Sequence, residues 1–179
     1  MDTPSIRISK TILWQQFGAA IDMFETAVRA CPDELWRETL WEDPSELPQY
    51  AQFWYVVFHT LIWLDLFLSG SMEGFTPPDP FTRDKRDPVT LLPEEPYTKE
   101  QLQVYLAHGR QKCQATIEAL TDETANRVCR FEWMELTFAE LLLYTMRHVQ
   151  EHGAQLNMLL GQKVGSVGDW VPQVGRGEA

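Results

Sequence analysis

The stretch FWYVVFHTLIWLDLFL, residues 53–68, is the most apolar part of the chain and decides its fold. A helix with this sequence has apolar side chains on nearly every side, so other elements must surround it. A membrane span needs about 20 apolar residues, whereas this stretch is shorter and contains His59 and Asp65. We therefore expect a central buried helix from about Gln49 to Leu68, and no membrane association.

Three further segments have apolar residues at the spacing of an amphipathic helix. These segments are Ile6 to Ala30, Thr98 to Leu120, and Thr137 to Gly161. Thr98 with Gln101, and Thr137 with Glu140, have the spacing of capping boxes, which mark helix starts. The alternating segment Val128 to Met134 is predicted to be extended or irregular. Four long helices without a convincing sheet predict an all-α fold, a four-helix bundle.

A Pro-rich connection and an irregular tail complete the expected domain. Gly70 opens a loop of roughly 27 residues, and a loop that long is usually functional or a crossover. We expect this loop to cover a site. The tail from about Lys163 is rich in glycine, with Trp170 as its expected anchor. A length of 179 residues predicts one domain over residues 1–179, because domains average about 150 residues.

Charge and cysteine content restrict the partners and the compartment. The chain has 15 Lys and Arg against 26 Asp and Glu, so its formal net charge of −11 repels a phosphate backbone. Nucleic acid is therefore not an expected partner. Cys31, Cys113 and Cys129 are odd in number and follow no pattern, which indicates a reducing compartment. Because the first residues also lack the apolar run of a signal peptide, we expect a cytoplasmic protein.

Three histidines are the candidate metal ligands. His148 and His152 are four residues apart, so their rings lie one turn apart on the same helix face and can chelate one ion. His59 is in the apolar helix, where no Lys, Arg or Glu is near in sequence, and a buried imidazole needs a partner. Three imidazoles leave a zinc-like ion an open position, as in catalytic sites. The alternative is that His59 is a hydrogen-bonded core residue and that the pair arose by chance.

Glu151 is a candidate catalytic residue between the two paired histidines. The segment His148 to His152, HVQEH, fits the inverted zinc-peptidase motif. We interpret this match as accidental, because that motif takes a distant downstream glutamate as its third ligand and only the short tail follows His152. Glu151 is nevertheless placed to act as a general base on a metal-bound water or to orient an imidazole. The alternative is a solvated or interface glutamate.

Three aromatic residues are expected to line a pocket over the ion. Tyr55 and Trp63 are one turn either side of His59, and Tyr144 is one turn before His148. The alternative is that these side chains belong to the core.

Three other residues are expected to lie outside the site. Asp65 is rotated to a different helix face from His59, so we expect it to pair with a basic residue. His108 is off the apolar face of its helix and is expected to be solvated. Cys113 is on that face, where a cysteine usually fills apolar space.

With these features the chain resembles the DinB-like superfamily, bacterial metal-binding four-helix proteins related to YfiT-type hydrolases. The resemblance rests on FHTLIWLDLFLSG, the Pro-rich crossover after it, and RHVQEHGAQLNMLLG. It implies an up-down-down-up bundle with a long crossover between the second and third helices. It also implies that His59, His148 and His152 bind one divalent ion, usually nickel, zinc or iron, with water completing the coordination. Gly153-Ala154 replaces an Arg-Gly pair that often follows the last ligand in the family.

The resemblance implies a site more clearly than a reaction. The family includes thiol-dependent S-transferases, relatives of maleylpyruvate isomerase, and many members of unknown activity. The leading hypothesis is a metal-dependent enzyme that activates a low-molecular-weight thiol or water for transfer to, or hydrolysis of, a small electrophilic substrate. The alternatives are a non-catalytic metal-binding stress or interaction protein, and a bundle without metal. A homodimer is also expected, because family members often pair.

Overall fold

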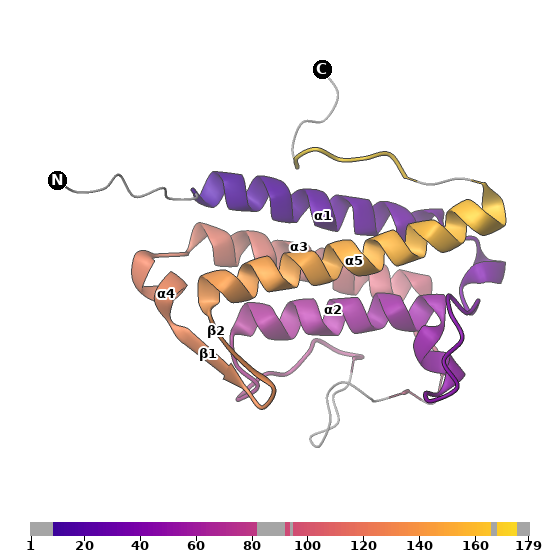
Figure 1. The fold of residues 1–179 in the computed structure, drawn as a ribbon, viewed down its shortest axis with the longest axis horizontal. Helices are drawn as coiled ribbons and strands as arrows, with labels where there is room; N and C mark the ends of the chain where they lie inside the picture. The colour runs from indigo at the N-terminus through magenta and orange to yellow at the C-terminus, as the bar shows by residue number, and fades with distance from the viewer. Residues whose placement is uncertain (1–8, 82–91, 94, 166–167, 175–179) are drawn as a thin grey trace.

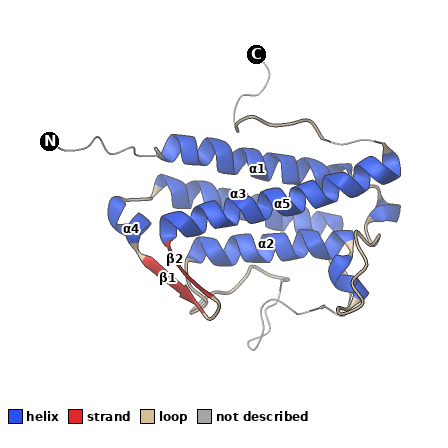
Figure 2. Cartoon of the chain, in the orientation of Figure 1, coloured by secondary structure: helices blue, strands red, loops and turns tan. Residues whose placement is uncertain are grey.

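The computed structural model describes residues 9–81, 92–93, 95–165 and 168–174, and this part of the chain is mostly helical (Figures 1 and 2). The four long helices are α1 (Lys10–Ala30), α2 (Phe53–Ser69), α3 (Lys99–Glu118) and α5 (Phe138–Val164). The short elements are the 3-10 turns η1 (Asp33–Leu35) and η2 (Pro48–Ala51), the helix α4 (Asp122–Asn126), and the strands β1 (Val128–Phe131) and β2 (Met134–Thr137).

The four long helices lie side by side, and each contacts two of the others. Helix α1 contacts α3 and α5, and α2 contacts the same two helices. Large apolar side chains from all four are fully buried between them, among them Phe17, Phe24, Leu64, Leu102 and Leu141. This contact pattern makes one shared core.

Helix α2 is the buried helix that the sequence predicts. Every residue from Phe53 to Leu68 is buried except His59, which is half-buried. The helix begins later than expected, because Pro48–Ala51 forms a 3-10 turn and Gln52 is extended. The first amides of a helix have no partner within it. Here the backbone N–H groups of Phe53 and Trp54 donate to the carbonyls of residues 38 and 36, at 2.9 and 3.0 Å.

The predicted capping boxes are both present. Thr98 begins α3 and Thr137 begins α5, each with its reciprocal side-chain and backbone hydrogen bonds. The predicted end of the last helix is wrong, because α5 passes through Gly161 and continues to Val164. Gly165 ends it in the left-handed conformation, at φ 69°, which glycine adopts without steric cost. Helix α1 starts at Lys10, and the earlier part of its predicted range lies outside the described residues.

The segment before the last helix, expected to be extended or irregular, is extended and forms an antiparallel hairpin. Strands β1 and β2 pair from Val128 with Thr137 to Phe131 with Met134. Trp133, in the turn between them, contacts Trp63 of α2, with ring centroids 5.5 Å apart. The hairpin thereby brings an aromatic side chain to α2 from a segment far along the sequence.

Much of the Pro-rich loop that was expected to cover a site, residues 82–91 and 94, lies outside the described residues. The described loop residues Phe81 and Tyr97 are buried against α3 and α2, and Phe81 stacks on Tyr105 with centroids 4.3 Å apart. The expected tail anchor is wrong: Trp170 is 72% exposed. Hydrogen bonds to α1 hold the tail: the backbone N–H of Val174 donates to the carbonyl of Gln15 at 2.9 Å, and the side-chain amide of Gln16 donates to the carbonyl of Pro172 at 3.1 Å.

The apolar stretch that forms α2 was not expected to cross a membrane. Within the described ranges, no helix has both the length and the hydropathy that a membrane crossing requires.

Candidate metal centre

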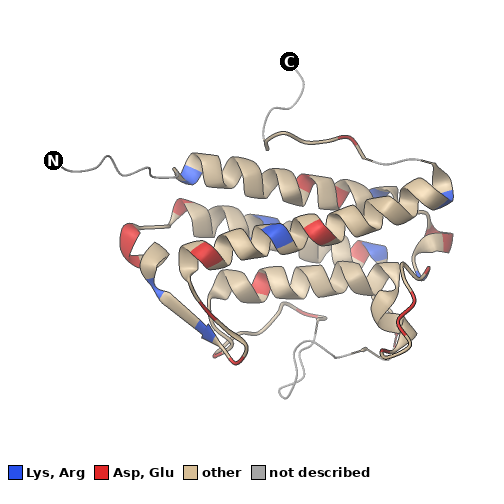
Figure 3. Cartoon of the chain, in the orientation of Figure 1, with Lys and Arg blue, Asp and Glu red and all other residues tan. Residues whose placement is uncertain are grey.

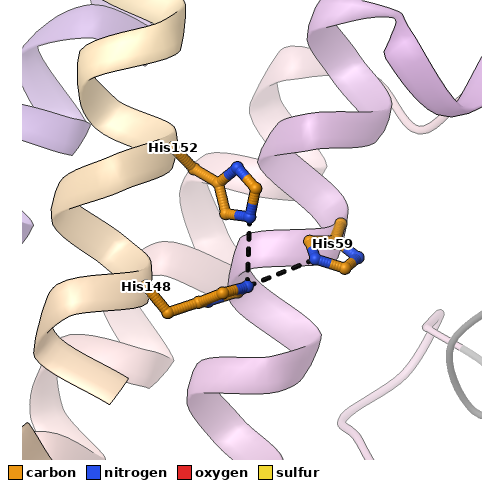
Figure 4. A group of neighbouring side chains, drawn as sticks. All are labelled: His59, His148 and His152. Atoms are coloured by element: carbon orange, nitrogen blue, oxygen red, sulfur yellow. Dashed lines mark hydrogen bonds between the residues drawn. The ribbon is translucent and has the colours of Figure 1, made fainter. Parts of the chain in front are cut away.

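The three predicted histidines meet where α2 and α5 pack together (Figure 4). Nε2 of His148 lies 3.2 Å from Nε2 of His59 and 3.1 Å from Nε2 of His152. One nitrogen from each ring falls within 4.8 Å of the other two. Two helices that are distant in sequence thus direct three imidazole nitrogens at one point.

Helix periodicity explains why two of these rings share a face. His148 and His152 are one turn apart on α5, and Val149 and Leu156 on the adjoining face are buried in the core. All three histidines are half-buried. They therefore lie at the edge of the core.

Gln155 fixes the orientation of the His152 ring. Its side-chain oxygen lies 2.7 Å from Nδ1 of His152. An amide oxygen can only accept a hydrogen bond, so Nδ1 carries the proton and Nε2 keeps its lone pair. The lone pair then points at the other two histidines. Metal-binding imidazoles are commonly oriented in this way, by a hydrogen bond from the other ring nitrogen to a group that does not bind the metal.

Among the described residues, the His148 ring has hydrogen-bond partners only in the other two histidines. Its Nδ1 is buried and unpaired in the part of the chain that the structure describes. Its Nε2 faces only the corresponding nitrogens of His59 and His152. Leaving a buried polar atom unsatisfied costs about 1–3 kcal/mol; a cation held by the three Nε2 lone pairs would satisfy Nε2 of His148, while Nδ1 would stay unpaired.

Burial keeps the three rings neutral. Desolvation, with the neighbouring His152 as a smaller cause, lowers the pKa of His59 to about 3. Desolvation, with His152 and His59, lowers the pKa of His148 to about 2. The pKa of His152 is also lowered by burial, against opposing contributions from Gln155 and Glu151. Lone pairs are therefore available at neutral pH, and neutral imidazole is the form that binds metals.

The spacing of the three nitrogens fits a divalent ion. Nitrogen ligands about 2.0–2.1 Å from a tetrahedral ion lie roughly 3.3 Å apart, close to the 3.1 and 3.2 Å separations found here. Imidazole suits zinc, nickel, iron and copper. A set of three such ligands also leaves a coordination position for water or substrate.

Two cavities open beside the histidines. The first, the Tyr50 cavity, has a volume of about 170 Å³ and is lined by Trp41, Glu46, Tyr50, Tyr55, Val56, His59 and His152. The second, the Trp133 cavity, has a volume of about 470 Å³ and is lined by His59, Trp63, Phe67, Trp133, Tyr144, His148, Glu151 and His152. His59 and His152 line both, so the candidate metal centre lies between the two cavities.

The three aromatic residues border two different cavities, and Tyr55 and Trp63 are also buried in the core, as the alternative held. Tyr55 lines the Tyr50 cavity, and Trp63 and Tyr144 line the Trp133 cavity. Sequence reasoning missed Trp41 and Trp133, which reach the cavities from the η1–η2 connection and from the hairpin turn. In the sequence each of them is only a tryptophan in a loop. Pairing between separate parts of the chain places them at the cavities, and it leaves no local signal.

Glu151 lies at the edge of the site. It is exposed on α5 and lines the Trp133 cavity together with His148 and His152. This exposed position beside the two histidines is compatible with a catalytic role and equally with a solvated glutamate.

Asp65 belongs to a separate buried network between α2 and α3. It is 1% exposed, and Nζ of Lys112 lies 2.5 Å from its Oδ1, as the sequence predicted for a basic partner. The hydroxyl of Tyr105 donates to its other oxygen at 3.0 Å. His108 is exposed, as expected, with its side chain at 44%, and its Nε2 lies 3.5 Å from Oδ1 of Asp65. Cys113 is fully buried, as expected, and burial raises the pKa of its thiol.

Comparison with known proteins was made against families, curated proteins and solved structures. No curated protein and no solved structure matches the chain. One family model matches residues 16–156, a range that includes all three histidines, and it describes the DinB superfamily.

Proposed function

The chain belongs to the DinB superfamily, and from this premise we propose that it binds one divalent metal ion through His59, His148 and His152. The observation that carries the proposal is the convergence of three Nε2 atoms from α2 and α5. The neutral state of the rings and the Gln155 contact to Nδ1 of His152 support it. Nickel, zinc and iron all accept this donor set.

The fold that we propose in detail is a single four-helix bundle of up-down-down-up topology. Helices α1 and α5 run in one direction in Figure 1, and α2 and α3 run in the other, which supports this topology. The long crossover then lies between α2 and α3. This arrangement sets α2 beside α5, the two helices that carry the proposed ligands.

We further propose that the protein is an enzyme acting on a small electrophilic substrate. A bound divalent ion lowers the pKa of a thiol or water that it coordinates, which makes a nucleophile at neutral pH. Gln155 holds the His152 ring in the tautomer that keeps Nε2 free. The aromatic walls of the Trp133 cavity bury the apolar part of the substrate. Glu151, at the rim of that cavity, accepts the proton that the nucleophile loses.

Metal content tests the binding proposal. Untagged protein should contain about one ion per chain by elemental analysis, and the ion should be lost in His59→Ala and in His148→Ala. His108→Ala is the matched control, because this histidine lies near Asp65 and lines neither cavity. Wild-type protein without metal after reconstitution with nickel, zinc and iron would overturn the proposal.

A second variant separates an enzyme from a metal-binding protein without turnover. Glu151→Gln should retain the ion and lose thiol transfer or hydrolysis in a screen of small electrophiles. A binding protein would instead show no turnover in the wild type, and metal removal would change only its stability.

A further inference from the structure

The lining of the Tyr50 cavity has the chemistry of a site for a small organic cation. Three of its side chains are aromatic, Trp41, Tyr50 and Tyr55, and the rings of the two tyrosines are 5.0 Å apart. Glu46 adds a carboxylate. Aromatic faces attract ammonium groups through their quadrupole, and aromatic cages bind alkylated ammonium ions in this way.

The charges around the cavity also favour a cation. Among its described lining residues, Glu46 is the charged side chain, and no Lys or Arg is present. Glu42 and Asp43 lie on the same connection (Figure 3), and the hydrogen bonds from Ser45 hold the pKa of Asp43 below its usual range. Lys163, which reaches this connection, is paired with Glu38 at 2.5 Å. An anionic substrate group would meet repulsion here without a basic partner.

The connection that carries Trp41, Glu46 and Tyr50 is held in place at both ends. Thr39 and Gln52 form a β-bridge, and the backbone N–H of Leu40 donates to the carbonyl of Ala51 at 2.8 Å. Asp43 accepts hydrogen bonds from the backbone N–H and hydroxyl of Ser45, at 2.9 and 2.6 Å. A wall fixed in this way loses little freedom on binding, which favours recognition of a small ligand.

We infer that the Tyr50 cavity binds the alkylated ammonium group of a small organic substrate. The inference rests on the proposed function in one respect, that this ligand is the substrate of the metal centre. Because His59 and His152 line the cavity, a donor atom a few bonds from the ammonium nitrogen would face an ion held by these histidines. The volume of about 170 Å³ equals roughly five to six waters at about 30 Å³ each, which suits a trimethylammonium group.

An isosteric pair of probes tests the charge preference. Choline and 3,3-dimethyl-1-butanol have the same shape and differ in the charge of one atom. Titration into chelator-treated protein, followed by NMR shifts of the tryptophan side chains, should show choline binding about five- to thirty-fold tighter, as cation–π contacts provide. Equal affinity, or tighter binding of the neutral alcohol, would overturn the inference.

Variants on the same connection locate the site. Glu46→Gln and Trp41→Leu should each reduce the preference for choline at least three-fold, while Trp41→Phe should keep most of it. Glu42→Gln is the matched control, because this substitution removes the same charge from a residue that lines a neighbouring cavity. If Glu42→Gln reduces the preference as much as Glu46→Gln does, the effect is general charge attraction and the assignment to this cavity is wrong.

Glycine betaine separates this inference from the metal proposal. Betaine carries the same trimethylammonium group as choline and adds a carboxylate, which can bind a metal ion. Loading the protein with metal should therefore raise the affinity for betaine at least ten-fold and the affinity for choline much less. If choline keeps its preference but metal does not tighten betaine, the cation site stands and its link to the metal centre fails. If neither effect is seen in protein that holds one ion, the cation site is overturned and the metal centre stands.

Discussion

The side-chain oxygen of Gln155 lies 2.7 Å from Nδ1 of His152, and this contact decides which nitrogen of the ring faces the other histidines. The oxygen accepts the Nδ1 proton, so Nε2 is left with its lone pair 3.1 Å from Nε2 of His148. Gln155 is three residues after His152 on α5, so one helix supplies both the ring and the group that orients it. The contact therefore orients one ligand of the proposed metal centre, although Gln155 itself is not one of the three proposed ligands.

Replacing Gln155 should weaken metal binding without removing it. Loss of a hydrogen bond that orients a metal-binding histidine typically costs about 10–100-fold in affinity. We expect that loss in Gln155→Leu and near wild-type affinity in Gln155→Glu, which still offers an acceptor oxygen. Competition with a chromophoric chelator measures both.

Gln150→Leu provides the control for this prediction. Gln150 is on the same helix, and its amide contacts the sulfur of Met23 at 3.9 Å, away from the histidine nitrogens. An affinity in Gln155→Leu that matches the Gln150→Leu control would show that the His152 ring is held by packing alone.

Acid should destabilise the metal-free protein through its buried histidines. The folded-state pKa of His59, about 3, and of His148, about 2, are far below the ordinary 6.5. Between those values the unfolded chain binds more protons than the folded one, so stability is complete above pH 6.5 and falls as the pH is lowered. Each histidine contributes a slope of up to about 1.4 kcal/mol per pH unit. Urea denaturation of chelator-treated protein at pH 7 and 5 measures the loss.

Comparison with the His59→Gln variant separates the contribution of this histidine to the pH dependence of stability from the contribution of the carboxylates. His59→Gln removes one of the titrating groups, so its free energy of unfolding should fall less steeply between pH 7 and 5. Identical slopes for the variant and the wild type would contradict burial of a neutral His59.

The sequence predicts those parts of the fold that depend on local rules. Apolar residues on all sides of α2 predicted its burial, and the side chains of Thr98 and Thr137 predicted the starts of α3 and α5. The end of α5 was missed, because Gly161 is tolerated within a helix whose neighbouring residues are packed, and Gly165 is the residue with positive φ. The hairpin was missed because pairing between two short strands has no strong local signal.

In the candidate site, too, the sequence predicts what local spacing determines and misses what packing between distant segments determines. The four-residue spacing of His148 and His152 is a local signal, so the sequence predicts that they share a face. His59 joins them only through packing of α2 on α5, which no local pattern encodes. Trp41 and Trp133 were not predicted to line the cavities, because a β-bridge and a hairpin bring them there.

The Asp65–Lys112 pair should contribute strongly to stability and not to metal binding. Asp65 is 1% exposed, and Lys112 contacts its Oδ1, its backbone carbonyl and Ser69. Lys112→Met leaves the buried carboxylate without its cation, which we expect to cost about 3 kcal/mol in urea denaturation. The double variant Asp65→Leu/Lys112→Met should recover most of this loss, because both buried charges are gone. Metal content should stay unchanged in both; a double variant as unstable as the single would contradict the charge argument.

Gly18 should decide whether the C-terminal tail stays on α1. A Cβ at Gly18 would lie 2.7 Å from the Val174 side chain, closer than real contacts allow. The tail is held there by the Val174 N–H bond to Gln15 and by the Gln16 amide bond to the carbonyl of Pro172, at 2.9 and 3.1 Å. These exposed bonds near the chain end are weaker than the packing of α1, so in Gly18→Ala the tail should move and the helix should stay.

The net change in the free energy of unfolding for Gly18→Ala should then be small, because two opposing contributions nearly cancel. Alanine favours a helix interior by about 1 kcal/mol over glycine, and two exposed hydrogen bonds of the tail are worth about the same together. We expect a thermal midpoint close to the wild type, with faster proteolysis of residues 168–174. In a chain truncated after residue 167 the tail contribution is absent, so the same substitution should raise the midpoint. A tail that stays protected from protease in Gly18→Ala would show that α1 itself shifts to accommodate the methyl group.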